Sequence, residues 1–250
     1  MTPDPVIGFR LFSFAHFAAL AGLVAVTIVI ARLGCAWHGR PAQQALESGL
    51  AWTNLAAWTA AHTWWLLPPH FRVEETLPLQ MCHLTSVAAS IVLLQRPRWA
   101  RVLLYFWGLV LSTQALITPS LLEGPDSIWF WGFWYLHGML VVAGVYDIAV
   151  HGYRPTLRDY GLACVLTILY VAVVLPLDVL VGANYGFVGP GRALQPSIVD
   201  LLGPWPQRLA IIVPLAAGAM AAGLLPWAWH ARRRRKSAAR APSSAPPSPR

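Results

Sequence analysis

Long apolar stretches alternate with short polar segments along almost the whole chain. Each of seven stretches is long enough to cross roughly 30 Å of hydrocarbon as an α-helix. Their approximate ranges are 12–32, 46–67, 78–95, 101–118, 129–149, 159–181 and 208–228. The pattern predicts an all-α integral membrane fold, a seven-transmembrane-helix bundle that occupies residues 1–230 as one domain.

The cationic residues predict how this bundle is oriented. With the N-terminus outside, all but four of the 18 Lys and Arg residues fall in inside segments. The four outside are Arg10, Arg72, Arg192 and Arg208. Because Lys and Arg gather on the cytoplasmic side, we expect the N-terminus outside and the C-terminus in the cytoplasm. The predicted location is the cell membrane, which for a bacterial protein is the inner membrane.

The composition is typical of a membrane protein and disfavours a nucleic-acid-binding function. Hydrophobic residues make up 57% of the 250 residues and charged residues 11%, with a formal net charge of +8. That charge alone would suit nucleic acid, but much of it lies in Arg232–Arg240, directly after the last apolar stretch. Such a segment is typical of an anchor on anionic lipid, so we expect no nucleic-acid partner. Residues 231–250, rich in Ala, Pro and Ser, are predicted to be a disordered cytoplasmic tail.

Polar residues gather toward the outer ends of the predicted helices. The bilayer interior disfavours polar groups, so a cluster of them is a candidate functional site. We expect an outward-facing pocket between the second and sixth helices, capped by the turn-rich segment 182–206. The inner half offers no comparable set. The predicted cluster consists of His62, Gln80, Cys82, His83, Gln114, His137, Asn184 and Tyr185.

Cys82 is the nucleophile candidate in this cluster. Cys35 and Cys164 lie near the predicted cytoplasmic side, so we expect Cys82 to be a free thiol rather than half of a disulfide. A histidine can activate a thiol for attack on an ester or thioester carbonyl. Amide side chains such as those of Gln80, Gln114 and Asn184 are suited to hold the resulting oxyanion.

Structural interpretations stand beside the catalytic one. Asn54 is interpreted as a hydrogen-bonding link between helices, and free cysteine often behaves as a small hydrophobe. Cys82, Ser86 and Ser90 share one face of the third helix, which is either a close helix contact or the wall of a site. His16, near the outer end of the first helix, is interpreted as interfacial.

Several motifs resemble the YwaF-type bacterial integral membrane proteins and, with them, the transmembrane protein 164 acyltransferases of animals. The resemblance implies a multi-pass membrane enzyme acting on phospholipid, with a catalytic cysteine at Cys82 and a catalytic histidine at His137. The motifs follow one another in order from the third to the seventh helix. They are Leu77-Pro-Leu-Gln-Met-Cys-His-Leu84, Gln114-Ala-Leu-Ile-Thr-Pro119, His137-Gly138, Gly182-Ala-Asn-Tyr185 and the segment 196–206.

Three function hypotheses follow. The preferred one is a phospholipid acyltransferase or acyl hydrolase with Cys82 as nucleophile and His137 as general base. Its partners would be membrane phospholipid and an acyl-lipid or other small-molecule substrate, with no cofactor. The sequence leaves protein partners open. The second is a redox protein with haem or a metal held by two of His62, His83 and His137, although no Cys-x-x-Cys-His motif or metal-ligand spacing supports it. The third is a non-catalytic lipid-binding or transport protein.

Overall fold

The computed structural model describes residues 8–191 and 201–229, and every regular element among them is a helix. The all-α membrane class is therefore confirmed for this part of the chain, whereas the predicted tail, 231–250, lies outside it. In chain order the elements are α1 (Phe14–Ala36), α2 (Pro41–Leu66), α3 (Met81–Leu94), α4 (Arg98–Leu103), the π-helix η1 (Leu104–Leu111), α5 (Gln114–Ile117), α6 (Ile128–Ala149), α7 (Leu157–Val181), the short 3₁₀ helix η2 (Tyr185–Phe187) and α8 (Leu209–Ala222).

Each of the seven predicted stretches contains a helix, but the helices differ in their suitability as membrane spans. Those long and apolar enough to cross are Phe14–Ala36, Arg98–Ile117, Ile128–Ala149, Leu157–Val181 and Leu209–Trp229, five among the described residues. α3 is apolar but has only 14 residues. α2 has 26 residues, but its first half carries Gln43, Gln44 and Glu47. The count of seven spans therefore stays a prediction.

Local sequence explains where several helices begin and end. The hydroxyl of Ser13 accepts a hydrogen bond from the His16 N–H and caps α1. Thr156 and Asp159 form a reciprocal capping box at the start of α7. Gly182 adopts the left-handed conformation, with φ of 70°, that ends the same helix.

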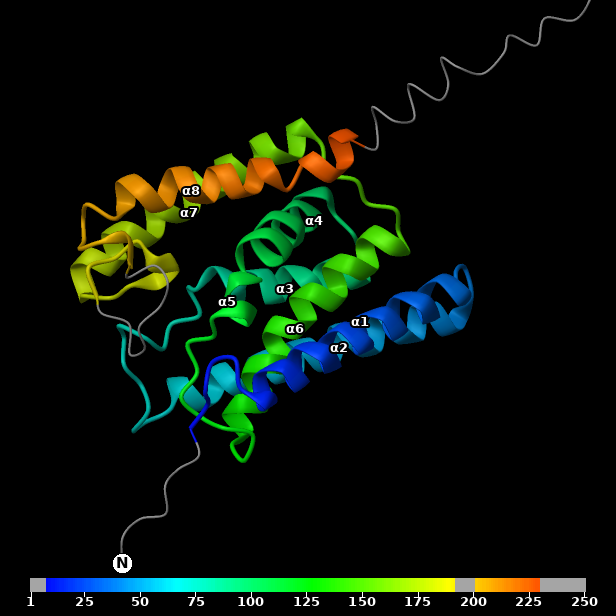
Figure 1. The fold of residues 1–250 in the computed structure, drawn as a ribbon, viewed down its shortest axis with the longest axis horizontal. Coiled ribbons are helices and arrows are strands. Elements are labelled where there is room, and N and C mark those ends of the chain that lie inside the picture. The colour runs from blue at the N-terminus through cyan, green and yellow to red at the C-terminus, as the bar shows by residue number, and fades with distance from the viewer. Residues whose placement is uncertain (1–7, 192–200, 230–250) are drawn as a thin grey trace, which may run out of the picture.

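α3 lies at the centre of the bundle (Figure 1) and packs against α2, α6 and η1. The α1–α2 hairpin lies on one side of this centre, and α7 with α8 lies on the other. Small buried residues of α3, Ala88, Ala89 and Ser90, allow this close packing. The two ends of the described chain lie at opposite ends of the bundle.

The fourth predicted helix is not a regular α-helix. It begins at Arg98 rather than 101 and widens into η1, where the Ser112 N–H donates to the Trp107 carbonyl five residues earlier at 2.8 Å. Gly108 makes this segment fit against α3, because a Cβ there would lie 3.1 Å from Cγ2 of Thr85. Such π-segments recur at functional sites.

Candidate functional site

Cys82 lies at the start of α3, as its second residue. The predicted helix start at 78 is wrong by three residues: Leu77–Gln80 precede the helix, and Gln80 is its N-cap with extended backbone. The thiol is free, as predicted, and so are Cys35 and Cys164.

Three imidazoles from three helices come together at the end of α3 that carries Cys82. The rings of His62 (α2) and His83 (α3) are in edge-to-face contact, with centroids 4.5 Å apart. His137 (α6) is near enough to interact electrostatically with His83. The structure thus brings these three predicted site residues together; we call their end of the bundle the histidine end.

Two of the three imidazoles have a defined tautomer. Nδ1 of His62 is 2.7 Å from the Trp58 carbonyl oxygen, and Nδ1 of His137 is 3.0 Å from that of Phe133. A carbonyl oxygen can only accept, so each Nδ1 carries the proton and each neutral ring keeps a lone pair on Nε2. His83 differs, because its buried Nδ1 has no hydrogen-bond partner among the described residues. His137 therefore has the protonation state that a general base requires.

Trp58 contacts both His62 and His83. Its indole ring stacks on the His62 ring with centroids 4.2 Å apart, and its Nε1 donates to the His83 carbonyl at 3.1 Å. Trp58 is a site residue that the sequence analysis missed. Its position one helical turn before His62 was the available signal.

The side-chain oxygens of the three predicted amide residues accept hydrogen bonds from other groups of the protein. Oε1 of Gln80 accepts from the Gly186 N–H at 2.9 Å, and Oδ1 of Asn184 accepts from Nη2 of Arg208 at 2.9 Å. Oε1 of Gln114, on α5, accepts from the Thr118 hydroxyl at 3.4 Å. These bonds orient each amide with its NH₂ group as the donor toward other partners.

The segment 182–191 lies against the start of α3, as the predicted cap requires. The Tyr185 hydroxyl accepts from the Leu77 N–H at 2.9 Å and donates to the Val73 carbonyl at 2.7 Å. Burial raises the pKa of Tyr185, so the hydroxyl keeps its proton for the second bond. Tyr185 therefore ties the segment to the chain leading into Cys82. Residues 192–200 of the predicted cap lie outside the described residues.

Two structural interpretations from the sequence now have an outcome. Asn54 links α2 to α3 as interpreted, because its Nδ2 donates to the Ser86 carbonyl and to the Ser90 hydroxyl, both at 2.8 Å. The face of α3 that carries small side chains is therefore a helix contact at Ser86 and Ser90.

The interpretation of His16 as interfacial is wrong. Its ring is fully buried, and Nε2 lies 2.9 Å from the Leu116 carbonyl, which links α1 to α5.

The expectation that the other end of the bundle holds no comparable polar set is also wrong. Three arginines, one in the α3–α4 connection and two in α4, each pair with a buried carboxylate of a different helix. Arg96 contacts Glu47 of α2 at 3.0 Å, Arg101 contacts Asp147 of α6 at 2.8 Å, and Arg98 contacts Asp159 of α7 at 2.8 Å. We call this the arginine end. Carboxylates inside apolar helices were the signal, since such groups require partners.

His151 joins this network in the connection between α6 and α7. Its Nε2 lies 3.0 Å from Oε1 of Glu47, which also accepts from the Tyr146 hydroxyl at 3.0 Å. Burial lowers the pKa of His151 more than the Glu47 carboxylate raises it. Burial and the Asp159 carboxylate raise the pKa of Tyr153 in the same connection. Both side chains are therefore uncharged at neutral pH.

One pair in the histidine cluster, His62 and His83, does not have the geometry of two axial haem ligands. Axial imidazoles lie on opposite faces of a haem, whereas the His62 and His83 rings touch and leave no space for a macrocycle between them. Within 8–191 and 201–229, no group of three His, Cys, Asp or Glu side chains could hold a metal ion.

Comparison with known proteins gives one family. The model of the TMEM164 family matches residues 11–239. Searches of curated proteins and of solved structures found no match. The match agrees with the predicted resemblance to transmembrane protein 164, whereas the likeness to YwaF-type proteins stays a prediction.

Proposed function

The chain belongs to the TMEM164 family, and from this membership we propose that it is a phospholipid acyltransferase or acyl hydrolase with Cys82 as nucleophile and His137 as general base. The observation that carries the proposal is the convergence of His62, His83 and His137 at the same end of α3 as Cys82. Polar groups inside a bilayer are costly, and these imidazoles do not serve as ion-pair partners of the kind found at the arginine end.

The proposed reaction has two steps. Nε2 of His137 takes the thiol proton while Sγ of Cys82 attacks the acyl carbonyl of a phospholipid ester. The ester C–O bond breaks, and the proton passes to the departing alkoxide oxygen, leaving a lysophospholipid and an acyl thioester. An acceptor hydroxyl, or water in a hydrolase, then attacks the thioester and returns its proton through His137 to the Cys82 sulfur.

In this proposal the side-chain amides donate hydrogen bonds to the carbonyl oxygen of the substrate. The NH₂ groups of Gln80, Gln114 and Asn184 are the candidate donors to the oxyanion, in the orientation that their bonded oxygens impose. His62 and His83 contact the acyl ester, and Tyr185 holds the segment that covers it. Under the predicted seven-span topology with an outer N-terminus, we expect this site in the outer half of the membrane, where phospholipid is the available substrate.

Intact-protein mass spectrometry tests the mechanism. Wild type and Cys82→Ala are purified in detergent and incubated with phosphatidylethanolamine. The proposal expects a fatty-acyl mass increment on wild type that hydroxylamine removes, and none on Cys82→Ala. An increment that persists in Cys82→Ala would contradict the assignment of the nucleophile. No increment together with no release of lysophospholipid, from protein that still binds lipid, would favour the lipid-binding or transport function.

A further inference from the structure

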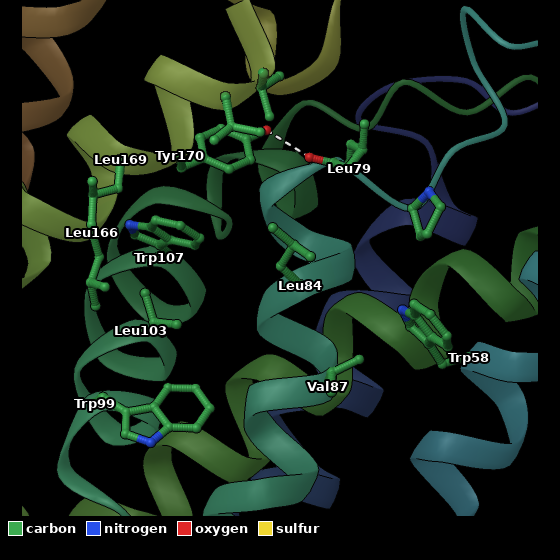
Figure 2. Close-up of a pocket in the computed structure, with 13 residues that line it drawn as sticks. Trp58, Leu79, Leu84, Val87, Trp99, Leu103, Trp107, Leu166, Leu169 and Tyr170 are labelled. Carbon is green, nitrogen blue, oxygen red and sulfur yellow. Dashed lines mark hydrogen bonds between the residues drawn. The ribbon is translucent and has the colours of Figure 1, made fainter. Parts of the chain in front are cut away.

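An apolar groove of about 570 Å³ follows α3 along the side that faces α7 and η1 (Figure 2). Leu84 and Val87 of α3 form its floor, and Trp107 stands on one side. Leu79 and Trp99 lie at its two ends. Its volume falls within the roughly 300–1,000 Å³ of small-molecule sites.

Three polar side-chain groups that border the groove are already hydrogen-bonded within the protein. The Tyr170 hydroxyl donates to the Leu79 carbonyl at 2.7 Å, a bond drawn in Figure 2. Nε1 of Trp107 donates to the Thr167 hydroxyl at 2.9 Å, and Nε1 of Trp58 donates to the His83 carbonyl at 3.1 Å. The groove therefore presents hydrocarbon to an occupant along its length.

Two lining residues connect one end of the groove to the candidate site. Trp58 stacks on His62 and bonds to His83. Tyr170, on the opposite wall, lies within electrostatic reach of Cys82. From there the groove runs along α3 toward Trp99, in the first turn of α4. Leu84 and Val87 of α3 line the groove between the candidate site and Trp99.

We propose that this groove holds one extended fatty acyl chain of the lipid substrate and that Trp99 closes its far end, so that the groove selects acyl-chain length. The inference rests on the proposed function, since the ester must lie at Cys82 for the chain to extend toward Trp99. A chain that leaves the bilayer for the groove gains little hydrophobic free energy, because lipid tails are as apolar as the protein. Selection therefore depends on shape and packing.

Two substitutions should move chain-length preference in opposite directions. Val87→Phe fills the middle of the groove, and we expect the ratio of long-chain to short-chain turnover to fall by about tenfold, as expected for steric mismatch of a few methylenes. Trp99→Ala opens the far end and should raise the same ratio. Ala57→Phe is the matched control, because Ala57 lines a different cavity, of about 1,230 Å³, between α1, α2 and α6. It should leave the ratio unchanged.

Photolabelling tests the location without requiring turnover. Wild type and Cys82→Ala are reconstituted in phosphatidylethanolamine vesicles in which one acyl chain carries a terminal diazirine, and labelled peptides are mapped by mass spectrometry. The proposal expects label at and around Trp99 in both proteins. Label concentrated on α1 or on the part of α6 lining the second cavity would overturn it.

The two proposals fail in distinguishable ways. Label near Trp99 without acyl transfer or hydrolysis in wild type would remove the catalytic function and keep the groove as a lipid-binding site. The opposite result is turnover that depends on Cys82 but label that lies elsewhere, with an unchanged chain-length ratio in Val87→Phe and Trp99→Ala. It would contradict the groove as the acyl-chain site and leave the catalytic proposal standing. Thermal unfolding of each variant identifies a loss of fold.

Discussion

At the scale of single residues, the histidines at the two ends of the bundle have different hydrogen-bond partners. His62 and His137 each give an Nδ1 proton to the carbonyl of their own helix four residues earlier, which needs no other charged group and leaves Nε2 available. His151 instead lies against the carboxylate of Glu47 and the guanidinium of Arg96, whose Nη1 is 3.3 Å from its Nε2. The first arrangement suits proton transfer, and the second suits a structural network.

His137→Gln tests the first arrangement. Glutamine has no basic ring nitrogen, so we expect acyl turnover to fall by about 10² to 10⁴, the usual contribution of a general base. The measurement is the rate of lysophospholipid release from defined vesicles. Phe133→Leu is a suitable control, because it removes the ring that packs at a tilt against His137, with centroids 4.2 Å apart, but keeps the backbone carbonyl that orients the imidazole. Equal losses in both variants would indicate a packing role for His137.

The second arrangement predicts a pH dependence of stability. The pKa of His151 is lower in the folded protein than its ordinary value of about 6.5, so the unfolded chain binds the proton more tightly. Stability is therefore complete above about pH 6.5 and is lost as the pH falls toward the folded-state pKa. The charged groups facing the ring are Glu47, Arg96 and Asp147.

We expect the melting temperature of wild type to fall between pH 7.5 and 5, and His151→Gln to show a smaller fall over that interval. Differential scanning fluorimetry in detergent measures both. Identical pH profiles for the two proteins would show that His151 does not supply the titrating group.

At the scale of helices, hydropathy located the elements but not their partners. The apolar stretches predicted all seven helical regions, because burial in hydrocarbon requires continuous apolar sequence. The third helix starts at Met81 rather than 78, and the fourth starts at Arg98, directly after Pro97, rather than at 101. Depth along predicted helices also brought His62, His83 and His137 to one level.

Pairing across helices could not be predicted in the same way. Arg96 and Glu47 are 49 residues apart, and whether they meet depends on the rotation of α2 and on the path of the α3–α4 connection. The same limit applies to Trp58. Its stacking on His62 can be predicted from the spacing within α2, but its hydrogen bond to His83 depends on how α2 and α3 are placed against each other. Single-helix patterns carry no information on such contacts.

Arg101→Ala tests the structural weight of the arginine end. Arg101 makes two bonds of 2.8 Å to Asp147, a carboxylate with 3% of its side chain exposed. Removing one partner of a buried ion pair leaves the other charge uncompensated, so we expect a loss of about 3–5 kcal/mol in unfolding free energy. Urea or SDS unfolding followed by tryptophan fluorescence measures the loss.

Arg98→Ala is the matched control for that variant. Its partner, Asp159, is also buried but keeps the bonds of the Thr156 capping box, at 2.8 Å from the Thr156 N–H and hydroxyl. Arg98 itself has 62% of its side chain exposed, so its removal should cost clearly less. A larger loss for Arg98→Ala than for Arg101→Ala would contradict this explanation of the network.

At the scale of the whole molecule, the arginine end and the predicted orientation depend on the same residues. Arg96, Arg98 and Arg101 pair with acids in the folded bundle, which reduces the net charge of that end. The orientation rule counts Lys and Arg during insertion, however, and acidic residues contribute little to it. The folded ion pairs therefore leave the prediction of an outer N-terminus unchanged, and with that orientation we expect the arginine end at the cytoplasmic face.

Reporter fusions in a bacterial host test this placement. Alkaline phosphatase, active only outside the cytoplasm, should be active when fused after Glu123, between α5 and α6, and inactive when fused after Arg154, between α6 and α7. A fluorescent protein at the C-terminus should fluoresce, because it folds in the cytoplasm. The reverse pattern would place Cys82 and the three histidines in the inner leaflet. In that case the substrate would be a cytoplasmic-leaflet lipid, even though the geometry of the site would be the same.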